Sequence, residues 1–307
     1  MNTINTIAIV GAGGLGAAYG SALWTTRPDS VWFLADGERL ERLNRDGVVV
    51  NDRHFAIPAF HPTKAPTPDL VIVTVKYHQL GEAIELIRPC AGPQTMILSL
   101  LNGIDSEEIM AEVFGAERII HGMSLGIDAV RHGNRITCAN YGTVYFGRPT
   151  NEPPAPEIVA IQELFTAGGI TWNTPPDMLR TLWWKFMINV GINQVSAVLD
   201  LSYRGFKTNP HARALMEAAM REVIALAQAQ NIDLGDEDIQ KWYGVIERLA
   251  PEGKTSMHQD VEQKRKTEVE MLAGKVMEIG ARLSIATPVN AVLFDLLRAR
   301  EVEYLSP

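Results

Sequence analysis

The chain has 307 residues, 46% of them hydrophobic and 21% charged, which is typical of a soluble globular protein with about two domains. Its formal net charge of −8 argues against nucleic acid or an anionic membrane as a partner. We expect neither a membrane segment nor a signal peptide, because apolar runs are short and no basic residue precedes the first one. Cys90 and Cys138 lie in no metal-ligand spacing, so we expect no metal and a cytoplasmic location.

The N-terminal residues predict a buried strand, a glycine-rich turn and a helix. A short apolar run of Ile4 and Ile7–Val10 precedes Gly11, Gly13 and Gly16, which match G-x-G-x-x-G, and an apolar helix Leu15–Leu23 follows. In this pattern the glycines allow a tight turn, close approach of a pyrophosphate and close packing of helix on strand. The free N–H groups of the helix also attract phosphate. We therefore expect a dinucleotide-binding loop, with a purely structural turn as the alternative. Its residues would be Gly11, Ala12, Gly13, Gly14, Leu15 and Gly16.

Polar residues close the next two strands. Val31–Ala35 reads as a strand ending at Asp36, whose carboxylate would accept hydrogen bonds from ribose hydroxyls and repel a 2′-phosphate. Alternatively, Asp36 caps the helix that follows. Asp69–Val75 is the clearest buried strand, and Lys76 follows at the end where open α/β sheets bind ligands. The alternative for Lys76 is an ordinary surface lysine.

The rest of this half completes an α/β pattern. After a strand at Thr95–Leu100, we expect Asn102 in a polar turn against the nicotinamide, followed by the helix Ser106–Phe114. Four short runs around a hairpin signal at Gly133-Asn134 predict an antiparallel extension of the sheet. These runs are Arg118–Leu125, Ile127–Arg131, Arg135–Ala139 and Gly142–Phe146. We expect residues 1–173 to form a Rossmann-type α/β domain with a mostly parallel sheet.

Residues 174–307 predict an all-α domain of about five helices, since periodicity and propensity are helical almost throughout. The expected helices are Met178–Val198, Pro210–Gln230, Asp236–Leu249, Asp260–Leu283 and Val289–Arg300. Thr287-Pro288 would open the last of them, as an N-cap residue with proline at the first helical position.

Two polar clusters in this half are candidates for chemistry. Lys185, Asn189 and Asn193 are spaced by four, so one face of an otherwise apolar helix would present an amine and two amides. A solvent-facing edge stripe is the alternative. Ser256 and Glu268 form the second cluster, although on the residues alone a helix cap for Ser256 and a solvated helix face for Glu268 explain them better. Twelve residues of straight helix would separate them by about 18 Å, so the chain must be irregular there if both contact one small substrate.

The chain resembles the ketopantoate reductase (2-dehydropantoate 2-reductase) family over nearly its whole length. The resemblance lies in G-A-G-G-L-G at Gly11–Gly16, V-T-V-K ending at Lys76, L-N-G around Asn102, W-K-x-x-x-N-x-x-x-N at Trp184–Asn193 and S-M-x-Q-D-x-x-x-x-x-x-T-E at Ser256–Glu268. It implies NADPH-dependent reduction of a 2-oxo acid, ketopantoate to pantoate in pantothenate biosynthesis, in a cleft between two domains.

The resemblance also implies roles for individual residues. Lys185 would be the general acid and Glu268 would orient it, while Ser256 would bind the substrate carboxylate. Further substrate contacts would come from Asn189, Asn193, Asn102 and Lys76, the last two also at the nicotinamide end.

Two positions depart from the family pattern. Asp36 stands where many relatives carry arginine and argues for NAD(H) rather than NADP(H), although Arg39 and Arg42 could still reach a phosphate. Gly253 stands where some relatives have a substrate-contacting asparagine, which leaves another 2-oxo acid open as substrate. A 3-hydroxy acid dehydrogenase and a non-catalytic dinucleotide sensor are the alternative functions, and a homodimer is possible.

Overall fold

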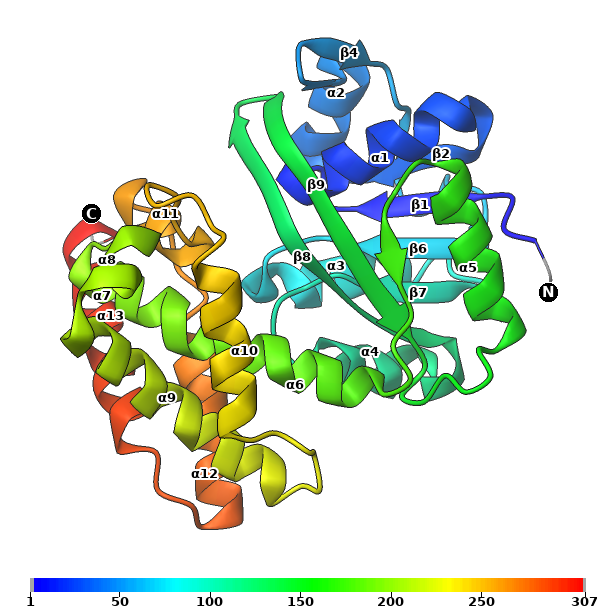
Figure 1. Cartoon of the computed structure of the whole chain (residues 1–307). Helices are drawn as coiled ribbons and strands as arrows, with labels where there is room; N and C mark the ends of the chain where they lie inside the picture. The colour runs from blue at the N-terminus through cyan, green and yellow to red at the C-terminus, as the bar shows by residue number, and fades with distance from the viewer. Residues whose placement is uncertain (1–2, 306–307) are drawn as a thin grey trace. The chain divides into compact units, whose positions relative to one another are not determined.

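The computed structural model describes residues 3–305 and divides into two compact units, Met1–Leu179 and Arg180–Pro307 (Figure 1). The first unit is built on a twisted mixed sheet and the second from helices. In the part of the chain that is described, no helix has the length and apolar character needed to cross a bilayer. The predicted fold class, a Rossmann-type α/β domain followed by an all-α domain, is confirmed.

A parallel core of buried strands forms the centre of the first unit. Its strands lie side by side in the order β7-β6-β1-β2 and are all parallel. They are β1 (Ile7–Val10), β2 (Val31–Leu34), β6 (Leu70–Val73) and β7 (Met96–Ser99). All their residues are buried, because helices cover both faces of a parallel sheet. This explains why the sequence shows continuous apolar runs rather than alternation.

Helices divide between the two faces of this sheet. Ile7 and Ile9 pack in the hydrophobic core that contains α1 (Gly14–Thr26) and α5 (Pro156–Ala167). Ala8 and Val10 pack in the opposite core, with α3 (Leu80–Ile87) and α4 (Ser106–Phe114). The remaining helix, α2 (Gly37–Asp46), follows β2 and contacts the short strand β5 (Ala59–Phe60).

A long antiparallel hairpin extends the sheet. The sequence predicts four short strands here, but the structure has two continuous ones, β8 (Ile119–His132) and β9 (Arg135–Gly147). The predicted turn at Gly133-Asn134 is confirmed. A register shift between Asp128 and Ala129 accommodates an irregularity, so that each strand continues where the sequence predicts a turn between two shorter strands. Three short strands were not expected from the sequence, β3 (Val48–Val50), β4 (Arg53–Phe55) and β5, and β10 (Trp172–Asn173) pairs with β9.

The second unit is helical, but two predicted long helices are wrong in detail. The segment expected as one helix from Met178 consists of three parts: α6 (Met178–Ile188), a short π-helix η4 (Asn189–Asn193) and α7 (Gln194–Leu199). The short π-helix is called a π-turn below. The segment expected as Asp260–Leu283 is interrupted between α11 (Ser256–Glu262) and a second π-turn, η5 (Glu270–Gly274), which leads into α12 (Lys275–Leu283). The other helices are α8 (Tyr203–Thr208), which the sequence did not predict, α9 (Pro210–Gln228), α10 (Asp236–Ile246) and α13 (Pro288–Leu305).

Candidate active site

The glycine loop between β1 and α1 has the tight geometry that its spacing predicts. Gly11 has a φ of +104°, and the Thr74 hydroxyl donates to its carbonyl at 2.7 Å. A Cβ on Gly16 would lie 1.9 Å from the Gly11 oxygen and 2.4 Å from Thr74 Oγ1. Both glycines are therefore required by the fold of the loop, one by its backbone conformation and one by close packing.

The neighbouring glycines leave the start of α1 open. A Cβ on Gly13 would meet nothing within 4 Å, and Gly13 is the N-cap residue of α1 with no side chain to cap it. Gly14 faces the main chain of β8, because its Cβ would lie 3.0 Å from the Ala129 oxygen. Ala12 and Leu15 are partly buried against the hydrophobic core. The first amides of α1 can therefore hold an anionic group such as a pyrophosphate.

Asp36 lies at the carboxyl end of β2, next to this loop in the sheet order. It occupies the N-cap position of α2, but its exposed side chain accepts no capping hydrogen bond. The helix-cap alternative therefore lacks its defining bond, and the carboxylate can accept hydrogen bonds from a ribose.

A group of arginines lies on α2 and β8. Burial and the positive charges of Arg42 and Arg39 lower the pKa of Arg131. A cavity of about 490 Å³ opens beside them, and it is lined by Arg42, Asp46, Arg131, Gly133 and Asn134. Asp46 is held by the neighbouring Arg45 at 2.8 Å, so the cavity keeps a basic character that suits an anion.

Lys76 and Asn102 follow β6 and β7, so both lie at the same edge of the sheet as the glycine loop and Asp36. Both residues are half-buried. Carboxyl ends of neighbouring parallel strands meet at one edge, and this is where open α/β sheets bind ligands. The predicted cofactor-binding residues of the first unit thus follow four neighbouring strands at one edge of the sheet.

Glu107, a buried carboxyl on the first turn of α4, supports the turn that carries Asn102. Its Oε2 accepts a hydrogen bond from Ser106 Oγ at 2.8 Å, and Ser106 Oγ lies 2.8 Å from Ser99 Oγ at the end of β7. Its Oε1 accepts from the Gly122 amide at 3.3 Å. Burial raises the pKa of Glu107 to about 7. Nothing in the sequence distinguishes this buried residue from Glu108 beside it, which is a glutamate of the same helical turn and is exposed.

In the second unit, Lys185, Asn189 and Asn193 lie along α6 and η4. Lys185 and Asn193 are each 8% exposed, and Asn189 is half-buried, so the solvent-facing alternative is wrong for this stripe. In an α-helix a stripe spaced by four drifts sideways, and the wider π-turn compensates part of that drift. The π-turn thus helps to keep both amides on the side of Lys185.

The π-turn is stabilised by buried side chains. Gln194 donates to the Val190 carbonyl at 2.8 Å and Ser196 to the Asn193 carbonyl at 2.9 Å. Gln194 also donates to Asn290 of α13 at 3.1 Å. These bonds satisfy carbonyls at a place where the regular helical ladder is altered.

Ser256 and Glu268 lie on either side of the break that their spacing requires. Ser256 is the exposed first residue of α11, and Glu268, 8% exposed, precedes η5. Between them the helix ends at Glu262 and Lys264 adopts a φ of +52°. Both α11 and η5 pack against η4. The solvated-face alternative for Glu268 is therefore wrong, and both segments adjoin the helix that carries the two asparagines.

Gly253 has a packing reason for departing from the family pattern. A Cβ at this position would lie 2.9 Å from the Tyr203 ring and 3.1 Å from the Ala250 carbonyl oxygen. Its own carbonyl accepts a hydrogen bond from the Tyr203 amide at 2.9 Å. An asparagine here would require the ring to move.

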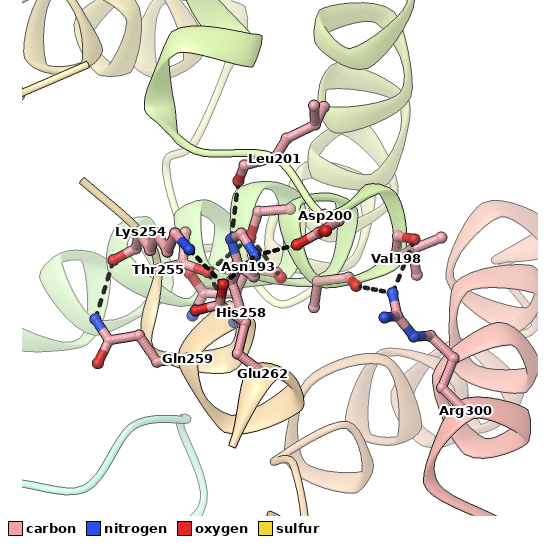
Figure 2. A network of polar contacts seen from close by, with 12 residues as sticks. Asn193, Val198, Asp200, Leu201, Lys254, Thr255, His258, Gln259, Glu262 and Arg300 are labelled. Atoms are coloured by element: carbon pink, nitrogen blue, oxygen red, sulfur yellow. Dashed lines mark hydrogen bonds and ion pairs between the residues drawn. The ribbon is translucent and has the colours of Figure 1, made fainter. Parts of the chain in front are cut away.

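A second polar network lies beside this region (Figure 2). His258 Nε2 lies 2.6 Å from Asp200 Oδ1 and 3.8 Å from Glu262 Oε1. Among the described residues these three form a group that could in principle hold a metal. However, two ligands each about 2 Å from one tetrahedral ion lie roughly 3.3 Å apart, so 2.6 Å is a direct hydrogen bond.

A glycine-loop α/β unit followed by a helical unit with a buried lysine and asparagines defines the class of two-domain oxidoreductases that use a dinucleotide. Comparison with known proteins specifies the class further. The family model described as ketopantoate reductase PanE/ApbA matches residues 7–151, and its C-terminal model matches residues 177–301. The chain belongs to the ketopantoate reductase family.

Individual relatives cover nearly the whole chain. The 2-dehydropantoate 2-reductase of Aquifex aeolicus is 26% identical over 303 residues, 96% of each chain. The crystal structure of 2-dehydropantoate 2-reductase from Geobacter metallireducens is 30% identical, with a TM-score of 0.85 over 96% of this chain and 99% of that one. D-mandelate dehydrogenase, in a ternary structure with NADH and anilino(oxo)acetate, is 22% identical with a TM-score of 0.89 over 98% and 99% of the two chains, which shows a shared fold.

Proposed function

We propose that the chain reduces a 2-oxo acid to the 2-hydroxy acid, with 2-dehydropantoate as substrate and pantoate as product. The observation that carries this proposal is Lys185, which is 8% exposed on a stripe with two amide side chains. An ammonium group kept from solvent beside neutral hydrogen-bonding groups is suited to donate a proton. Membership of the ketopantoate reductase family supports the choice of substrate.

The proposed residues divide the chemistry between them. A reduced nicotinamide, when bound, supplies the hydride for C2 of the substrate. As C2 gains that electron pair, negative charge grows on the carbonyl oxygen, which the Lys185 ammonium stabilises and protonates to the hydroxyl. Glu268 would orient Lys185 and the substrate, and Ser256 would bind the substrate carboxylate. Asn189 and Asn193 would hydrogen-bond its other polar groups.

A screen of 2-oxo acids with NADH and NADPH, followed by absorbance, tests the reaction. Lys185→Ala is expected to lower kcat by roughly 10²- to 10⁴-fold while nucleotide affinity changes little, since only the proton donor is lost. Lys266→Ala is the matched control, because this exposed lysine pairs with Glu270 in the same unit. Oxidation of 3-hydroxy acids in place of 2-oxo acid reduction, or nucleotide binding without turnover, would contradict the proposal.

We propose NADH as the preferred cofactor. The exposed Asp36 carboxylate can accept hydrogen bonds from the ribose hydroxyls, and its charge repels a 2′-phosphate. The opposing feature is the basic cavity beside Arg42 and Arg131, which would favour NADPH if the phosphate reached it.

Titration of protein fluorescence with each nucleotide separates these possibilities without turnover. The wild type is expected to bind NADH more tightly, and Asp36→Arg to reverse the preference, because a guanidinium attracts the phosphate that the carboxylate repels. If the wild type prefers NADPH and Arg42→Gln removes that preference, the arginine group determines specificity instead of Asp36.

The state of the two cysteines indicates the compartment of the protein. Cys90 and Cys138 are buried free thiols, which supports a reducing compartment, and we place the protein in the cytoplasm.

Helix α13 exposes Val292, Leu296 and Val302 within one broad stripe, and we propose that this stripe is the interface of a homodimer.

A further inference from the structure

A buried histidine fastens the first turn of α11 to the end of α7 (Figure 2). The His258 side chain is 2% exposed, its Nδ1 lies 3.1 Å from the Leu201 carbonyl oxygen and its Nε2 lies 2.6 Å from Asp200 Oδ1. A carbonyl and an ionised carboxylate can only accept hydrogen bonds. The ring N–H groups therefore act as the donors, and the imidazole links the first turn of α11 to Asp200 and Leu201.

Hydroxyl groups fasten the same turn from its other side. Thr255, the N-cap residue of α11, accepts a hydrogen bond from the His258 amide at 3.2 Å. Its hydroxyl lies 2.6 Å from Ser196 Oγ, which donates to the Asn193 carbonyl at 2.9 Å. Ser256 is thus the exposed residue of a turn whose neighbours on both sides are fixed to the helix that carries Asn193.

The surrounding charges are few and come from four segments. Glu262, on α11, places Oε1 3.8 Å from His258 Nε2 and binds the Lys254 ammonium, which precedes the helix. Arg300 of α13 donates to the Ala197 and Val198 carbonyls at the end of α7.

We propose that Asp200 and His258 are positioning residues that hold Ser256 in place for the substrate carboxylate, and that loss of their hydrogen bond loosens this turn. The Asp200 side chain is 72% exposed whereas the His258 side chain is 2% exposed, so Asp200 can be substituted without disturbing the core. The role of Ser256 rests on the proposed function, whereas the contact itself does not.

Two substitutions of Asp200 separate its hydrogen bond from its charge. Asp200→Asn keeps a side chain of similar size, and its amide can hydrogen-bond His258 Nε2 without the negative charge. Asp200→Gly removes the carboxylate without backbone strain, since φ 56° and ψ 47° suit glycine. Glu252→Ala is the matched control: Glu252 is also 72% exposed, but its partner, Arg204, is exposed rather than buried.

Hydrogen–deuterium exchange of residues 254–262 and steady-state kinetics with 2-dehydropantoate give independent readouts. We expect Asp200→Gly to speed exchange and raise KM about tenfold with kcat little changed, the loss expected for one charge-assisted hydrogen bond. Asp200→Asn should match the wild type at neutral pH. Glu252→Ala should change neither readout.

Each contrary result has its own meaning. Wild-type exchange rates in Asp200→Gly would overturn the fastening role of the pair. Faster exchange with an unchanged KM would overturn the positioning of Ser256. A KM in Asp200→Asn that rises as far as in Asp200→Gly would overturn the hydrogen bond as the fastening contact. If the wild type reduced no 2-oxo acid, the proposed function would fail, while exchange would still decide whether the contact fastens the turn.

Discussion

At the residue scale, two buried ionisable groups of the first unit affect stability in opposite directions as pH changes. Burial raises the pKa of Glu107 to about 7, from an ordinary value of 4.5. Burial, with the positive charge of Arg148, lowers the pKa of His121 to about 4 from 6.5. Between about pH 4.5 and 7 the folded chain keeps a proton on Glu107 that the unfolded chain has lost, so rising pH destabilises the fold through this group. Between about pH 4 and 6.5 the unfolded chain binds a proton at His121 that the folded chain lacks. Rising pH therefore stabilises the fold through this group.

Glu107→Gln isolates the first of these effects. The glutamine oxygen can accept from the Gly122 amide and its NH2 can donate to Ser106 Oγ, neither of which ionises. The loss of stability from pH 5 to 8 should therefore be smaller than in the wild type, by up to roughly 3 kcal/mol. Denaturant unfolding at several pH values measures it, and the His121 contribution cancels in the difference. Glu108→Gln, exposed on the same turn, is the control. Identical pH profiles in Glu107→Gln and the wild type would show that Glu107 is ionised in the fold without cost.

At the scale of elements, the π-turn η4 depends on a glycine that faces α9. A Cβ on Gly191 would lie 2.6 Å from Met220 Cγ and 3.1 Å from Met216 Cγ. Both methionines are fully buried, so they have little room to move. The close approach of these helices therefore fixes the turn that carries Asn189 and Asn193.

Gly191→Ala should destabilise the protein by about 1 kcal/mol, because overpacking exceeds the gain in helix propensity. It should also raise KM for the 2-oxo acid, as Asn189 and Asn193 move with the turn. Gly244→Ala in α10 is the control, since its Cβ would meet nothing within 4 Å and only the propensity gain remains. Thermal unfolding and kinetics of both variants provide the measurements. Equal stabilisation by the two substitutions would contradict tight packing at Gly191.

At the scale of the whole molecule, the exposed stripe of α13 bears on assembly. Val292 and Val302 are each 59% exposed and Leu296 is 45% exposed, an unusual amount of large apolar surface for one helix. Light scattering should find a dimer of the wild type, and Val292→Asp with Leu296→Asp should shift it to monomer, because buried charges oppose association. Glu237→Gln, exposed on α10 and outside this stripe, should leave the dimer intact. A monomeric wild type at high concentration would exclude this interface.

The sequence by itself determined the features that arise from local pattern. The glycine loop, the buried strands β1, β6 and β7, and the hairpin turn at Gly133-Asn134 follow from runs of a few residues whose conformation depends on their neighbours in the chain. The lysine and asparagines of the Lys185 stripe were found in the same way, from a spacing of four.

Only the tertiary structure decided features whose partners lie far along the chain. Glu107 is buried because β8 brings Gly122 against it, and Asp200 meets His258 across 58 residues. The helix after Glu262 breaks although its periodicity continues, since Thr267 bonds to Glu301 of α13. Periodicity reports which face of a segment is apolar, whereas the choice of partner depends on long-range packing and on burial that no single segment encodes.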